Sequence, residues 1–117
     1  MKNYTKTNVG TAARTELHDA LSLTGAEVSI NQLPAGAGAP FVHSHKHNEE
    51  IYGVISGSGK AVIDGETVPL TAGDWLRVAP AAKRQFSAAA ESGITFVCIQ
   101  VKENSLDGFT ADDAVVY

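Results

Sequence analysis

The chain is poor in cysteine, in basic residues and in long apolar runs, and each shortage excludes a class of protein. Cys98 is its single cysteine, so no intrachain disulfide can form and the disulfide framework of small secreted domains is excluded. Lysine and arginine total 9 against 13 aspartates and glutamates, giving a net charge of −4. Because nucleic acids are bound by basic surfaces, we expect no nucleic acid partner. We expect a cytoplasmic, reducing location.

Apolar stretches are short throughout. The polar start, Met1–Lys6, leads into no apolar segment of a signal peptide, and no stretch approaches the roughly 18 apolar residues of a membrane span. We therefore expect no membrane partner. A length of 117 residues, with 44% hydrophobic and 19% charged residues, is typical of one globular domain. We predict a single domain over residues 1–117, with its core at about residues 26–101 and an extension at each end.

From about residue 26 onward, short apolar segments alternate with clusters of Gly, Pro, Asn and Asp, which is the pattern of an all-β protein. Proline and glycine recur at residues 34–40, where we expect a loop, and a turn is predicted at Gly57–Gly59. The pair Asp64-Gly65 predicts a two-residue hairpin. Strands are predicted at Glu27–Leu33, Glu50–Ser56, Lys60–Ile63, Thr67–Leu70, Trp75–Val78 and Ile94–Val101, the last one buried on both faces.

The two ends of the chain are less regular. Within residues 15–23, the spacing of Leu17 and Leu21 favours a short helix capped by Thr15, although Leu21 and Leu23 also alternate as in a strand. Residues 102–117 carry four acidic side chains and end in Ala-Val-Val-Tyr, which predicts a solvated connection followed by one terminal strand.

The candidate functional residues concentrate in one segment. Three of the four histidines are His43, His45 and His47. In an extended strand, His43 and His45 project to the same side and can share a metal ion. His47 continues this alternation but lies where a turn is expected, and turn side chains usually point to solvent. Glu50 adds a carboxylate, whereas Glu49 points to the opposite face of the strand.

This segment resembles the first motif of the cupin superfamily, which runs glycine, spacer, His-x-His, three or four residues, Glu, six residues, Gly. Here Gly36 or Gly38 precedes His43-Ser44-His45, and six residues separate Glu50 from Gly57. The second cupin motif, Gly-Asp, a short strand and Pro-x-x-x-His, is similar to residues 73–84.

The resemblance implies an all-β double-stranded β-helix, a jelly-roll barrel, here with a short N-terminal helix. Within the superfamily, the sequence resembles small bacterial single-domain cupins. This resemblance implies a homodimer but does not specify a reaction. One position departs from the pattern, because Arg84 stands where the family has histidine.

The resemblance further implies a divalent metal ion bound by His43, His45 and Glu50, with Fe, Mn, Ni, Co and Zn as candidates. Cupins that bind metal usually use three histidines and one glutamate, whereas a guanidinium has no lone pair to donate. His47 is a candidate for the missing ligand. Two roles for Arg84 remain open: it binds an anionic ligand, or it forms an internal ion pair with Glu50 in a barrel that holds no metal.

Several other side chains have two interpretations. Tyr52 shares the face of Glu50, so its hydroxyl contacts a bound ligand or its ring belongs to the core. Cys98 lies inside an apolar strand, where we expect a small hydrophobic residue and not a nucleophile. Trp75 and Arg77 share one face of their strand, which is a candidate subunit contact.

Three functions are consistent with these residues. The first is a metal-dependent enzyme, a dioxygenase or an isomerase, acting on a small anionic molecule. The second is a non-catalytic module that binds or senses a small molecule, and the third is a dimeric protein with a vestigial, metal-free site. Fold alone does not choose among them.

Overall fold

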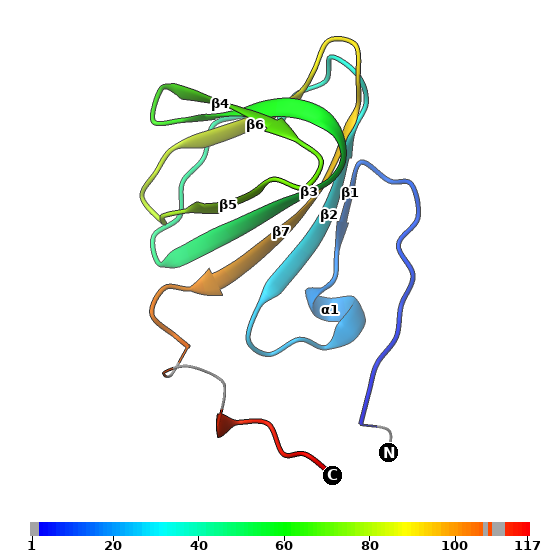
Figure 1. Cartoon of the computed structure of the whole chain (residues 1–117), viewed down its shortest axis with the longest axis vertical. Helices are drawn as coiled ribbons and strands as arrows, with labels where there is room; N and C mark the ends of the chain where they lie inside the picture. Colours follow the sequence, from blue (N-terminus) through cyan, green and yellow to red (C-terminus); the bar gives the residue numbers. More distant parts are fainter. Residues whose placement is uncertain (1–2, 107, 109–111) are drawn as a thin grey trace.

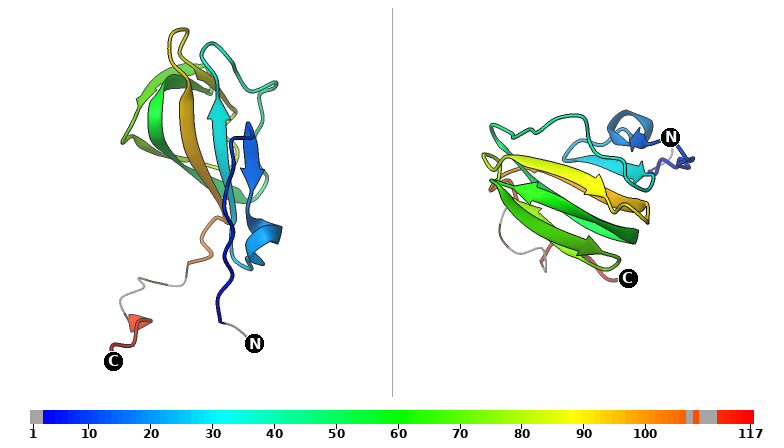
Figure 2. Two further views of the ribbon diagram at one scale, coloured as in Figure 1. Left: turned by 90° about the vertical axis from the view of Figure 1, so that its right-hand side faces the viewer. Right: turned by 90° about the horizontal axis from the view of Figure 1, so that it is seen from above.

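The structure is a computed structural model that describes residues 3–106, 108 and 112–117, and these are arranged mainly as antiparallel strands (Figure 1). The first and last described residues lie at the same end of the molecule (Figure 2). In chain order the elements are β1 (Arg14–Glu16), α1 (His18–Leu21), β2 (Glu27–Leu33), β3 (Asn48–Ile63), β4 (Glu66–Thr71), β5 (Trp75–Val78), β6 (Arg84–Ala88) and β7 (Ile94–Lys102).

The long strand β3 belongs to both layers of the barrel. Its first half pairs with β7 on one side and β5 on the other, and β7 continues through β2 to β1. Its second half pairs with β4 and β6. The strand therefore curves from one sheet into the other, as Figure 1 shows. The predicted all-β jelly-roll barrel is confirmed.

The curve in β3 replaces the turn that the sequence predicted at Gly57–Gly59. The prediction was wrong because the glycines bend the strand without ending it. The pairing with β7 shifts between Val54 and Ser56, which is a β-bulge. Gly57 then adopts φ +79°, and a Cβ atom there would collide with the carbonyl oxygen of Gly93. Glycine thus permits both the backbone angle and the close approach.

Two other predictions about the strands have different outcomes. The Asp64-Gly65 hairpin is confirmed, since both residues have positive φ, 49° and 84°. β7 is not buried on both faces, because its residues alternate between buried and half-buried over 94–98. In an antiparallel sheet, one face packs on the core and the other is free to meet solvent. The strand β6 was not predicted, because the sequence reading assigned its residues only to a motif.

The ends of the chain agree with the sequence in part. The short helix exists as α1, but Thr15 does not cap it, because Thr15 lies in β1 and pairs with β2. Residues 114–117 form no strand in the part of the chain that the structure describes. Among the described residues, no helix has the length and apolar character needed to cross a membrane.

The buried core contains a cluster of three aromatic rings. Phe86 packs between Tyr52 and Phe96, with centroid separations of 4.2 and 5.1 Å. All three side chains are buried. The aromatic cluster is therefore part of the buried core.

Candidate metal centre

The segment that carries the histidines is held in an extended conformation by the barrel wall. The N–H of His43 donates to the carbonyl of Arg84 at 3.1 Å, and the N–H of Arg84 donates back to the carbonyl of His43 at 2.9 Å. The N–H of His45 donates to the carbonyl of Pro80 at 2.8 Å. This strand-like pairing turns both imidazoles to one side, with ring centroids 5.2 Å apart.

The two imidazoles meet the carboxylate of Glu50, which projects from β3. The Nε2 atom of His43 lies 3.7 Å from Oε1 of Glu50, and Nε2 of His45 lies 3.4 Å from Oε2. The three ligand atoms all lie within 4.8 Å of one another. The sequence spacing therefore predicted a real cluster.

The donor set fits a divalent metal ion. Atoms that bind one zinc-like ion at about 2.1 Å are themselves separated by about 3.0 to 3.4 Å. The distances of 3.7 and 3.4 Å between the two imidazole nitrogens and the Glu50 oxygens are close to this range. Nε2 of His45 is buried and has no hydrogen-bond partner among the described residues. Buried polar atoms are rarely left without partners. A metal ion bound to Nε2 of His45 would supply the partner that this nitrogen lacks.

Glu50 is also the centre of a buried hydrogen-bond network. Its Oε1 atom accepts bonds from Nη1 of Arg84 at 2.9 Å and from the hydroxyl of Tyr52 at 2.5 Å. Its Oε2 atom accepts a bond from the thiol of Cys98 at 3.2 Å. The ion pair between Glu50 and Arg84, one of the two roles left open by the sequence, is therefore present.

These contacts set the protonation of the site. Burial alone would raise the pKa of Glu50, but the hydrogen bonds from Tyr52 and Cys98 and the electrostatic effects of His45 and Arg84 lower it below its usual value. Burial is also the main cause that lowers the pKa of His43, against the opposing effect of Glu50. At neutral pH the site presents a carboxylate and a neutral His43 imidazole, the forms that bind metals.

Burial and the neighbouring Glu50 raise the pKa of Cys98 to about 12. Burial similarly raises the pKa of Tyr52. Both groups stay protonated at neutral pH and act as hydrogen-bond donors, so Cys98 is not a nucleophile of the ordinary thiolate kind.

The other acidic and imidazole candidates lie elsewhere. The side chain of His47 is exposed and is not part of the cluster, although its carbonyl accepts a bond from the N–H of Glu103 at 3.0 Å. Glu49 points away from the cluster, as its alternation with Glu50 predicted, and accepts a bond from Nε of Arg77 at 2.7 Å.

A cavity of about 620 Å³ opens beside the cluster, within the size range of small-molecule sites. Tyr52 reaches this cavity, but Arg84 is not among its described lining residues. The lining residues are Ala13, Arg14, Asn31, Leu33, Gly38, Ala39, Pro40, Phe41, His43, His45, Glu50, Tyr52, Phe96, Cys98 and Gln100.

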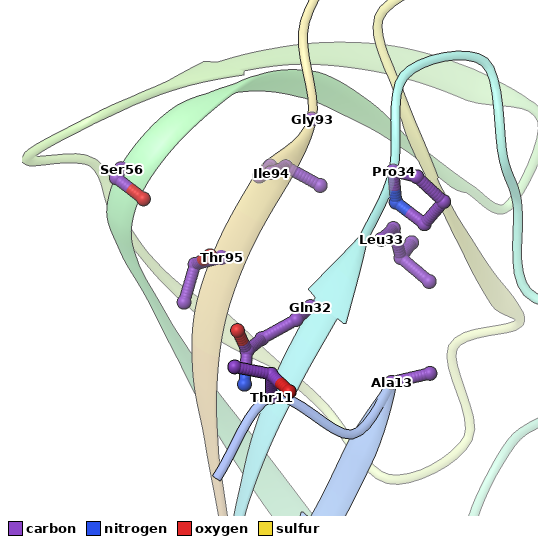
Figure 3. Close-up of a pocket in the computed structure, with 9 residues that line it drawn as sticks. All are labelled: Thr11, Ala13, Gln32, Leu33, Pro34, Ser56, Gly93, Ile94 and Thr95. Carbon is purple, nitrogen blue, oxygen red and sulfur yellow. The ribbon is translucent and has the colours of Figure 1, made fainter.

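A second cavity, of about 560 Å³, lies near the end of β2 and is lined partly by the N-terminal segment (Figure 3). Thr11 and Gln32 supply polar atoms there, and Thr95 and Ser56 supply hydroxyls. None of its nine described lining residues is titratable, so it offers neither an acid–base group nor a charged ligand for a metal. The chemistry therefore belongs to the cavity that contains the histidines.

The sequence reading missed two parts of the site. Cys98 was expected only as a core residue, although its pairing opposite Tyr52 brings its thiol to Glu50. The inward alternation of the apolar strand was the available signal. Arg14 lines the cavity without any recognisable sequence signal, since β1 was not predicted, whereas Asn31 lies in a predicted strand but was not proposed as part of the site.

Comparison with known proteins adds a family. The model of the family described as "Cupin domain" matches residues 30–100. No curated protein matches the chain. A crystal structure of a cupin protein from Bacteroides fragilis is 67% identical, covers 100% of this chain and 99% of its own, and superimposes with a TM-score of 0.95.

Two more distant structures share the fold. A predicted oxalate decarboxylase from Thermotoga maritima is 23% identical over 64% of each chain, with a TM-score of 0.60. A sugar phosphate isomerase of the cupin superfamily from Silicibacter pomeroyi is 24% identical, over 77% of this chain and 60% of its own, with a TM-score of 0.67. At these identities the likeness concerns the fold alone.

Proposed function

Because the chain belongs to the cupin family and its barrel gathers two imidazoles and a carboxylate, we propose that it binds one divalent metal ion and a small molecule beside it. The metal ligands are His43, His45 and Glu50. The observation that carries the proposal is the buried Nε2 of His45, which has no hydrogen-bond partner among the described residues and lies 3.4 Å from Oε2 of Glu50.

The surrounding residues hold this ligand set in place. Tyr52 and Arg84 fix one oxygen of Glu50, while Oε2 faces His45. Arg84 also adds a permanent positive charge, which weakens the attraction of the site for a cation. We therefore expect a moderate metal affinity.

A bound divalent ion would supply a Lewis acid or, for iron, an oxygen-binding centre. Two imidazoles and one carboxylate leave coordination positions for a substrate. A dioxygenase and an isomerase are the reaction classes that this ligand set supports.

Metal titration tests the proposal directly. The purified protein, stripped with a chelator, is titrated with Mn²⁺, Fe²⁺, Co²⁺, Ni²⁺ and Zn²⁺ by calorimetry, with iron kept anaerobic. We expect one ion per chain, and we expect His45→Ala and Glu50→Gln to weaken binding by at least about tenfold, since losing a residue that only hydrogen-bonds to a metal ligand already costs that much. His18→Ala is the matched control, because His18 is exposed and makes its hydrogen bond with Asp19. No stoichiometric binding, or equal binding by His45→Ala, contradicts the proposal.

A second candidate function rests on the ion pair between Arg84 and Glu50. At 2.9 Å this pair already neutralises the buried carboxylate, so a barrel without metal is also electrostatically balanced. In that case the protein is a non-catalytic module that binds or senses a small molecule in the same cavity. A thermal-shift screen after chelation separates the two, because ligand stabilisation that is independent of metal favours the module.

The homodimer and the cytoplasmic location stay predictions. Trp75 is the candidate contact, since its side chain is 60% exposed and lies over Gly53 on the outside of the sheet. Light scattering of the parent and of Trp75→Glu measures the oligomeric state. We expect a dimer that the glutamate weakens.

A further inference from the structure

The cation that could meet an anionic ligand is not the one that the sequence indicated. The guanidinium of Arg84 is fully buried, with 0% exposure. Its Nη1 donates to Glu50, and its Nη2 donates to the carbonyl of Ala79 at 2.5 Å. The Nε atom of Arg84 has no hydrogen-bond partner among the described residues, but it is buried. Arg84 is not among the described residues that line the cavity, so it is not positioned to bind a molecule there.

Arg14 occupies the wall of that cavity instead. Among the described lining residues, it is the one lysine or arginine. Its strand β1 pairs with β2 in a register that puts Arg14 opposite Asn31, and its Nη1 donates to Oδ1 of Asn31 at 3.0 Å. Its Nε donates to Glu16 at 3.1 Å, while its Nη2 donates to none of the described residues. Half of the side chain, 51%, is exposed.

The partner of Arg14 is itself anchored inside the barrel. Asn31 is buried, and its Nδ2 donates to the hydroxyl of Ser29 at 3.0 Å. Ser29 is 1% exposed. A buried polar pair is costly unless its bonds are made, so it restricts the position of the group that completes them. The guanidinium is therefore fixed before any ligand arrives.

The rest of the cavity wall is chemically divided. An apolar surface is provided by Leu33, Pro40, Phe41 and Phe96. The cluster of His43, His45 and Glu50 and the thiol of Cys98 also line the cavity. Arg14 and Cys98 line the same cavity, so the cation is within reach of the cavity interior. The charges of Glu50 and Arg84 cancel each other. The ion-pair partner of Arg14, Glu16, is exposed, so water screens its negative charge.

From this arrangement we infer that the cavity binds a small organic carboxylate with an apolar body, and that Arg14 binds its carboxylate. The free Nη2 and the remaining N–H of Nη1 offer the two parallel donors that a carboxylate accepts. The apolar body lies against Phe41 and Phe96, and the far end of the molecule reaches the cluster of His43, His45 and Glu50. The inference rests on the proposed function only for the use of this cavity.

Matched pairs of acids and amides test the inference. The probes are acetate and acetamide, benzoate and benzamide, and phenylacetate and phenylacetamide, measured by thermal shift and calorimetry on the full chain. We expect at least one acid with a ring to bind more tightly than its amide. Arg14→Met should weaken that acid by at least about tenfold, because a charge-assisted bidentate contact is lost. Arg14→Lys should lose less of the affinity for the acid than Arg14→Met does.

Two controls keep the outcomes distinct. Arg77→Met removes a guanidinium that is paired with Glu49 and Glu103 outside the cavity, and it should leave acid binding unchanged. Metal titration of Arg14→Met should match the parent within about twofold, because Arg14 is not a ligand. If no acid exceeds its amide, or if Arg14→Met binds the acid as the parent does, the inference is wrong while metal binding stands. If acids bind through Arg14 and no metal binds, the metal proposal fails and the inference stands.

Discussion

The pair of Arg84 and Glu50 supports a prediction in which the metal and the arginine compete for the same carboxylate. The side chains are 0% and 5% exposed and lie 2.9 Å apart. Arg84→Met keeps most of the volume and removes the charge, which leaves a buried carboxylate with hydrogen bonds only from Tyr52 and Cys98. Breaking a buried ion pair on one side costs about 3–5 kcal/mol of unfolding free energy. For a domain of this size, that lowers Tm by about 12–20 °C.

The matched control for this variant is Arg77→Met. Arg77 forms two ion pairs, with Glu49 and Glu103, but its side chain is 52% exposed. Surface pairs contribute about 0–1 kcal/mol, so we expect a Tm change of at most about 4 °C. Both variants are unfolded in urea with a chelator present, and the fluorescence of the single tryptophan reports the transition.

Metal is expected to compensate for part of the loss at Arg84. An ion bound by Glu50 neutralises the carboxylate that Arg84 no longer pairs, and the repulsion between guanidinium and metal is gone. At an effective dielectric constant of 20, two unit charges 4 Å apart interact by about 4 kcal/mol. We therefore expect Arg84→Met to bind metal at least about tenfold more tightly than the parent, with a smaller stability loss when metal is present. Arg84→His should bind metal still more tightly, since it adds an imidazole.

Two results would refute this reasoning. If Arg84→Met loses no more stability than Arg77→Met, the buried pair does not carry the energy assigned to it. If its metal affinity equals that of the parent, Arg84 and the ion do not act on the same carboxylate.

Three further predictions follow from the same structure. The pKa values of Glu50 and His43 are lowered on folding, so the unfolded chain binds protons at these groups first as the pH falls. The free energy of unfolding should therefore fall below about pH 6.5 and again below about pH 4.5. Urea titrations from pH 8 to 4 measure this, and a profile that does not change with pH contradicts it. Gly57→Ala should lower the free energy of unfolding by at least about 2 kcal/mol, because the position has a positive φ and a Cβ atom there would collide with the opposite backbone. Gly10 has open space around it, so Gly10→Ala should change this free energy very little, and equal urea midpoints for the two variants would contradict the prediction. Gly53→Ala should displace the indole ring that covers it and shift the tryptophan emission; an unchanged spectrum would mean that the ring does not lie there.

The cluster of candidate metal ligands could be predicted from the sequence because their positions depend on local geometry. His43 and His45 are two residues apart on an extended segment, so alternation alone places both rings on one side. The same alternation separates Glu50, which joins them, from Glu49, which pairs with Arg77 outside. The Asp64-Gly65 hairpin was predictable for the same reason, since the turn is decided by two adjacent residues.

The groups that surround those residues could not be predicted, because they come together through tertiary contacts. Cys98 reaches Glu50 through pairing between β7 and β3, which are far apart in sequence. Arg84 lies behind Glu50 and not in the cavity, a choice that depends on how β6 packs beside the histidine segment. Arg14 enters the wall because β1 adds to the edge of β2. Such contacts depend on the register between distant strands, and periodicity within one segment contains no information about that register.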